Sequence, residues 1–250
     1  MHLPEFTAHQ WALALLAAFC LGLAKGGFSG IGLFTILLMA EVLPARESTG
    51  VVLPLLICGD VLSVASFVRH TQWHHVWRTL PPAAVGVIAG YFLMQHIPDR
   101  IFRPVIGWIV LSMVILQAIH RLRPSILQNT PHSQWFGWIM GGWSGVTTMV
   151  ANAAGPVMTL YLLSVNLPKF EFVGTGAWFF LVINIFKLPF SYSLGLINGG
   201  SLTFNSVLVP SVLLGVLVGR KLIGIIPQKL FELLLLLFAA AASLRLVWAS

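Results

Sequence analysis

The chain has 250 residues, of which 58% are hydrophobic and only 8% are charged, and its formal net charge is +7. Soluble domains carry about 25% charged residues, so a chain this apolar cannot present a polar surface to water. The composition excludes a soluble globular domain and predicts an integral membrane protein. The basic residues lie in short loops between apolar runs, where membrane topology places them, and no basic tail or zinc spacing indicates nucleic-acid binding.

Eight stretches of the sequence have the composition of membrane elements, and they fall into two sets of four. The last three stretches of each set are close to the roughly 20 residues that a helix needs to cross a bilayer. In chain order, we expect elements at about 10–41, 49–68, 80–96 and 101–120, and then at 134–165, 173–194, 203–222 and 228–248.

The two sets also match in sequence. The glycines of "GLAKGGFSG" (22–30) match those of "GWIMGGWSG" (137–145) at an offset of 137 − 22 = 115, and later motifs match at offsets of 124 and 129. Internal duplication in a membrane protein favours a transporter or a channel over an enzyme. We therefore expect a first transmembrane repeat at 1–121, a polar linker at 122–134 and a second repeat at 135–250.

The first element of each set is too long for one crossing. About 30 residues would form a helix of about 45 Å, whereas the hydrocarbon core is about 30 Å thick. The pairs Gly26-Gly27 and Gly141-Gly142 interrupt these elements, so we expect two half-helices that meet and turn back. The predicted fold is all-α: a polytopic membrane protein of two inverted repeats, each with a broken, re-entrant helical hairpin and three transmembrane helices. The distribution of Lys and Arg favours inversion and places both termini outside the cytoplasm.

A break in a membrane helix exposes backbone amides, and the positive end of the helix dipole then faces whatever binds there. An anion is the natural ligand, and two such breaks would face one shared site near the midplane. Close packing of helices through small residues is the alternative interpretation of the same glycines. The predicted substrate-binding residues at the breaks are Gly26, Gly27, Phe28, Ser29, Gly30, Gly141, Gly142, Ser144 and Gly145.

Five further polar residues fall within the predicted spans. Lys25 adjoins the first break, where it could contact the anion or be satisfied by carbonyl groups, and Lys187 could contact the anion or snorkel to an interface. Asp60 is in the middle of a span, so it could pair with a lysine or carry a proton. Its match at the offset of 124 is Asn184, and we assign both to coupling or gating. Asn152 could line the site or bridge helices.

Other reactive side chains have simpler explanations. Cys20 and Cys58 lie in apolar runs, which is typical of buried thiols. His70 and His74 are spaced for metal binding, but the neighbouring tryptophans indicate a membrane interface, and no metal or cofactor is expected. The motifs "GFSG" and "GWSG" match the serine motif of rhomboid intramembrane proteases, yet no histidine base lies within a span of the second half, so no enzyme is expected.

The order and spacing of these motifs resemble the TauE/SafE family of membrane transporters, also called the sulfite exporter or TSUP family. The resemblance is carried by "GLAKGGFSGIG" (22–32), its weaker copy "GGWSGVTTMVANAAGP" (141–156), "PARESTG" (44–50) and the two-fold layout. It implies secondary transport, with export as the expected direction, of sulfite, thiosulfate or an organosulfonate across the bacterial cytoplasmic membrane. The expected partners are this small anion, membrane lipid and, from the buried carboxylate of Asp60, coupling protons. A passive anion channel is the alternative.

Overall fold

The computed structural model describes residues 6–28, 31–122 and 134–222, together with residues 240, 241, 244 and 248. These residues form nine α-helices and one short 3₁₀ helix, and none of them is in a β-strand, so the all-α fold is confirmed. The elements are α1 (Ala8–Lys25), α2 (Gly32–Val42), α3 (Ala45–Phe67), η2 (Val68–His70), α4 (Trp73–His96), α5 (Asp99–Leu122), α7 (Gln134–Ala151), α8 (Ala154–Ser164), α9 (Lys169–Ser193) and α10 (Gly199–Leu222).

Five of these helices, α1, α3, α5, α9 and α10, are long and apolar enough to cross a membrane, which makes the chain a multi-pass membrane protein. Helix α4 begins at Trp73 rather than at the expected residue 80, because Pro81 and Pro82 lie inside the helix and not at its start. Most of the predicted linker and almost all of the predicted element at 228–248 lie outside the described residues.

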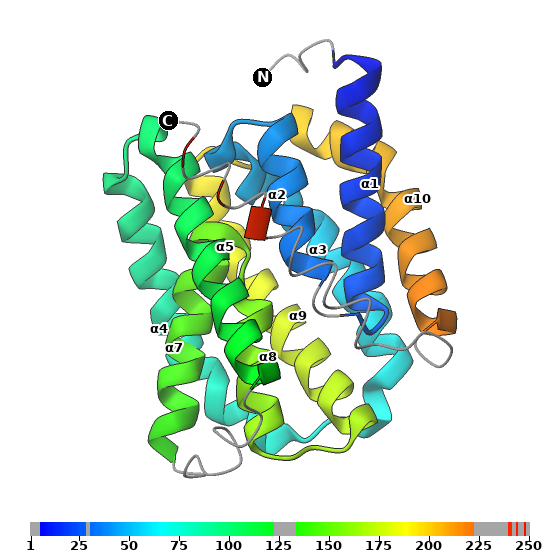
Figure 1. Ribbon diagram of the computed structural model, residues 1–250, viewed down its shortest axis with the longest axis vertical. Helices are drawn as coiled ribbons and strands as arrows, with labels where there is room; N and C mark the ends of the chain where they lie inside the picture. Colours follow the sequence, from blue (N-terminus) through cyan, green and yellow to red (C-terminus); the bar gives the residue numbers. More distant parts are fainter. Residues whose placement is uncertain are drawn as a thin grey trace.

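Both long first elements form hairpins. In the first, Thr35 of α2 donates its hydroxyl to the backbone oxygen of Ala17, in the middle of α1, at 3.2 Å. In the second, the rings of Phe136, at the start of α7, and Tyr161, near the end of α8, have centroids 6.2 Å apart. Each short helix therefore runs back along the helix before it. In Figure 1, α1 starts at the top of the molecule and α7 at the bottom, so the two hairpins enter from opposite ends.

The first break lies where the sequence predicts it. Helix α1 ends at Lys25 and the chain becomes helical again at Gly32. Between them, Gly27 has a φ of 125°, a backbone conformation that favours glycine. The glycine cluster thus opens the turn of this hairpin.

The second break does not lie at the predicted glycines. Helix α7 runs through Gly141 and Gly142 without interruption and ends at Ala151. The chain turns instead at Asn152, whose φ of 55° is left-handed and which is among the residue types that tolerate this conformation best. The prediction that Gly141 and Gly142 break a helix is therefore wrong, because their role is in packing.

Glycines allow two pairs of helices to approach closely. A Cβ built on Gly145 of α7 would lie 2.9 Å from the Cα of Gly86 in α4, and one built on Gly26 of α1 would lie 2.9 Å from the Cα of Gly219 in α10. Any side chain at these positions would push the helices apart. Figure 1 shows the two pairs at opposite edges, α1 with α10 and α4 with α7, while α3 and α9 contact each other between them.

The same contacts change the register in which the two predicted repeats align. Gly22 meets Gly215 while Gly145 meets Gly86, and Gly86 and Gly215 match at the offset of 129. Gly145, and not Gly137, therefore takes the place of Gly22, which gives an offset of 145 − 22 = 123 instead of 115. The two offsets differ by 123 − 115 = 8 residues, which is close to two helical turns. Because the glycines recur every four residues, a shift of eight residues places glycine on glycine again.

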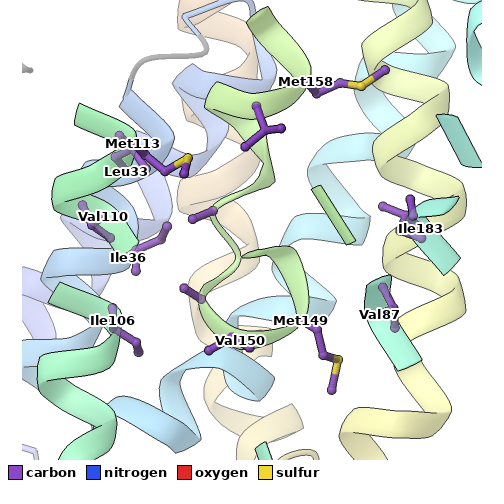
Figure 2. Close-up of a cluster of buried hydrophobic side chains, with 14 of the residues drawn as sticks. Leu33, Ile36, Val87, Ile106, Val110, Met113, Met149, Val150, Met158 and Ile183 are labelled. Carbon is purple, nitrogen blue, oxygen red and sulfur yellow. The ribbon is translucent and has the colours of Figure 1, made fainter. Parts of the chain in front are cut away.

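The largest apolar core packs against the second hairpin and holds its turn in place. Ile36 of α2 and Val110 of α5 are buried in this core, together with Met149 before the turn and Met158 after it. Figure 2 shows Met149 and Met158 on either side of the unwound segment, with α2 and α5 beside it. The turn is thus enclosed by protein, which is the condition under which non-helical backbone is tolerated at membrane depth.

Candidate functional site

Three ionisable side chains lie in the interior where the hairpin turns meet α3 and α9. Asp60 of α3 is 0% exposed and Lys187 of α9 is 1% exposed. Lys25, the last residue of α1, places its Nζ 2.5 Å from Asp60 Oδ1 and 4.6 Å from the ring centroid of Phe180. Because a buried charge is costly unless it is paired, Lys25 and Asp60 stabilise each other.

Asn184 of α9 links Lys187 to Asp60, and Asp60 in turn pairs with Lys25. The Nδ2 of Asn184 donates to Asp60 Oδ2 at 2.7 Å, and its Oδ1 accepts from Lys187 Nζ at 3.4 Å. Asp60 and Asn184 match at the offset of 184 − 60 = 124, so the contact between α3 and α9 joins the same position of the two halves. A carboxylate and its near-isosteric amide therefore face each other.

Lys187 does not snorkel to an interface, which removes one of its two predicted roles. Its Nζ donates to the backbone oxygen of Thr148 at 2.8 Å, to Thr148 Oγ1 at 3.1 Å and to Asn152 Oδ1 at 2.7 Å. These oxygens belong to the last turn of α7 and the residue after it, where backbone carbonyls begin to lack helical partners. Lys187 therefore ties α9 to the turn of the second hairpin.

Asn152 combines the two roles that the sequence left open, since it lines the cavity described below and bridges helices. Its Oδ1 accepts from Lys187, and its Nδ2 donates to the backbone oxygen of Thr49 in α3 at 2.8 Å. The turn of the second hairpin is thereby hydrogen-bonded to both α3 and α9.

We expect Asn152→Ala to lower the free energy of unfolding by about 1–3 kcal/mol, because it removes both hydrogen bonds and places alanine in a left-handed conformation. Thermal unfolding in detergent measures the loss. Asn166, with a φ of 53°, has the same backbone conformation after α8, so Asn166→Ala is the matched control for strain alone. An equal loss in both variants would contradict a role for the Lys187 and Thr49 contacts.

A cavity of about 130 Å³ opens beside the charged cluster. Lys25, Asp60 and Asn184 form part of its wall, and much of the rest is apolar. Gly32 and Gly155, near the starts of α2 and α8, also line it. The N-terminal ends of two half-helices thus border the same space, and the positive ends of their dipoles favour an anion there.

The predicted site residues divide into three groups. Those that line the cavity or contact its lining are Lys25, Gly27, Asp60, Asn152, Asn184 and Lys187. Those that the structure places elsewhere are Gly26 and Phe28, which pack in helix contacts, and Gly141, Gly142, Ser144 and Gly145, which lie inside α7. Ser29 and Gly30 lie outside the described residues.

Sequence reasoning missed Thr148, Gly32 and Gly155 as residues of the cavity. The repeat contained the signal, because the offset of 123 aligns Thr148 with Lys25 and Gly155 with Gly32. At this offset residues 29–32 align with residues 152–155, and Gly32 and Gly155 are the identical pair. The alignment of the glycines at an offset of 115 is wrong by eight residues, so it did not pair these cavity residues.

Comparison with known proteins gives one match. The family model of the sulfite exporter TauE/SafE matches residues 12–246, a range that includes every residue that lines the cavity and both hairpins except the first four residues of α1. Neither the search of curated proteins nor the search of solved structures found a match. A match over almost the whole length, together with the paired hairpins, agrees with the resemblance seen in the glycine motifs. The chain belongs to the TauE/SafE sulfite exporter family.

Proposed function

We propose that this protein is a secondary transporter that exports a small sulfur-containing anion, such as sulfite, thiosulfate or an organosulfonate, across the bacterial cytoplasmic membrane. The observation that carries the proposal is the ammonium group of Lys25 in the wall of a cavity that the starts of α2 and α8 also border. A cation and two helix N-termini that border one cavity favour an anion over a neutral or cationic solute.

In this proposal the anion binds near the midplane, between the turns of the two hairpins. Lys25 is the residue that contacts it, because its side chain is 14% exposed and lines the cavity. Lys187 is a positioning residue, since its ammonium holds the turn at Asn152. Ser29 and Gly30 stay candidates for hydroxyl and amide contacts with the anion.

Asp60 is the proposed site of the coupling proton. Protonation would remove the negative charge beside Lys25, so the proton and the anion would influence each other's binding. The two halves act as inverted repeats that expose the cavity to each side of the membrane in turn. A passive channel would share the cavity and the cation, but it would have no use for a buried carboxylate.

Transport into proteoliposomes tests the proposal. We expect the wild-type protein to accumulate a C2 sulfonate or sulfite when a pH gradient is applied, and to exchange labelled for unlabelled anion without one. Asp60→Asn should lose gradient-driven accumulation and keep exchange, because the proton carrier is gone while the cation remains. If neither protein moves any of these anions, the proposal fails, and if the gradient has no effect on either, a channel is the better description.

A further inference from the structure

We propose that Asp60 restricts the site to singly charged anions, an inference that rests on the proposed function and narrows its substrate class. Among the described residues that line the cavity or contact its polar wall, three are charged: Lys25, Lys187 and Asp60. Protein oxygen atoms hold Lys187, so a ligand meets one cation that can turn toward it, Lys25, and one fixed carboxylate, Asp60. One negative charge on the ligand is therefore matched by Lys25.

Asp60 is fixed in the wall of the cavity and cannot turn away from a ligand. Lys25 is paired with its Oδ1 and the amide of Asn184 donates to its Oδ2, so both carboxylate oxygens are held. The side chain is also fully buried, which keeps water from screening it. A second negative charge on the ligand would have to approach this fixed carboxylate.

Lys187 cannot offset that repulsion. A lysine ammonium has three donors, and Lys187 Nζ already lies within hydrogen-bonding distance of four oxygen atoms, the two of Thr148 and the Oδ1 atoms of Asn152 and Asn184. Lys25 is thus the cation that can turn toward a ligand, and it supplies one positive charge. A doubly charged anion would leave one of its charges without a partner beside a buried carboxylate, which carries a penalty.

The chain offers near-isosteric variants that change this charge. Asp60→Asn removes the carboxylate beside the cavity, and Asn184→Asp places a second carboxylate against the first. The double exchange Asp60→Asn/Asn184→Asp leaves the number of charges unchanged and moves the carboxylate from α3 to the facing position of α9. Side-chain shape is nearly conserved in all three, but Asn184→Asp also removes the amide that donates to Asp60, so Asp60→Asn and the double exchange are the variants that report on charge.

The test compares the binding of methanesulfonate and sulfate to the purified full-length protein by calorimetry at pH 7.5. The two ligands have similar tetrahedral shapes but charges of −1 and −2. We expect the wild type to bind methanesulfonate at least tenfold more tightly than sulfate. Asp60→Asn should reduce this ratio at least tenfold, Asn184→Asp should weaken binding of both anions, and the double exchange should restore the wild-type ratio.

Each outcome decides something different. If the wild type binds neither these anions nor sulfite, the proposed function fails. If it binds methanesulfonate and sulfate equally, or if Asp60→Asn leaves the ratio unchanged, transport of anions stands and the inference about charge is overturned.

Should Asp60→Asn fail to fold, the double exchange still tests the inference, because a ratio of the two affinities that differs from the wild-type ratio would contradict control by charge. Under this inference hydrogen sulfite and organosulfonates of single charge are substrates, whereas thiosulfate, sulfate and sulfonates with a second negative group are rejected.

Discussion

Lys25→Met is expected to abolish anion binding, with a loss of more than a hundredfold in affinity, and to lower the free energy of unfolding by about 3–5 kcal/mol. The first effect follows because the cavity loses the cation that can face a ligand. The second follows because Asp60 stays buried without its partner, and an uncompensated buried charge costs about this much. Calorimetry with methanesulfonate measures the first effect, and thermal unfolding in detergent measures the second.

Two controls separate these effects. In Lys25→Met/Asp60→Asn the buried carboxylate is gone as well, so most of the stability should return while anion binding stays lost. Lys221→Met removes a positive charge from the exposed end of α10 and should change neither quantity. Normal anion binding by Lys25→Met would show that Lys25 is a structural charge only, which is the alternative that the sequence left open.

Gly145→Leu is expected to prevent folding, with a loss of roughly 3 kcal/mol or more. The new side chain would lie where α7 meets the backbone of α4, and a backbone cannot move aside as a flexible side chain can. Gly215→Leu should have a similar effect on the contact between α10 and α1, where a Cβ would lie 2.3 Å from the backbone oxygen of Phe19. The yield of monodisperse protein in size-exclusion chromatography, followed by thermal unfolding, measures both losses.

The matched control for these two variants is Gly199→Ala. Gly199 is the first residue of α10, and a Cβ built there would have no atom within 4 Å. We expect Gly199→Ala to fold as well as the wild type or slightly better, because alanine reduces the entropy of the unfolded chain. Good folding of Gly145→Leu would contradict the close approach of α4 and α7.

The two hairpins could be predicted because they follow from length. A stretch of about 30 apolar residues is too long for one crossing and too short for two, so it must turn back wherever its sequence allows. The position of the first turn was also predictable, since Gly27 adopts a conformation that favours glycine. These conclusions needed no knowledge of the rest of the molecule.

The position of the second turn could not be predicted from the glycines. Glycine permits a break in a helix and also permits two helices to touch, and only the neighbour decides between these uses. That neighbour is α4, at residues 73–96, which lies far from Gly141 and Gly145 in the sequence. The better local signal was Asn152, a residue type that tolerates the left-handed conformation, followed by two small residues.

For the charged residues, too, the sequence predicts that a contact exists but does not identify the partner. A carboxylate in the middle of a span predicts a partner, but the sequence does not say which lysine supplies it. Lys25 reaches Asp60 because the first hairpin places the end of α1 beside α3. Lys187 instead reaches the end of α7, so the two lysines have different partners although both lie near Asn184 and Asp60.

Helices from the first half of the sequence pack against helices from the second half, and this packing determines which parts of the molecule can move together. Helix α1 of the first half packs against α10 of the second, and α7 of the second packs against α4 of the first. A motion that separated the two halves of the sequence would break both glycine interfaces at once. A motion of α1 and α10 against α4 and α7 would keep both interfaces closed and would have to be taken up by the elements between them, which include α3 and α9. The hydrogen bond between Asp60 and Asn184 would then lie at the pivot of that motion.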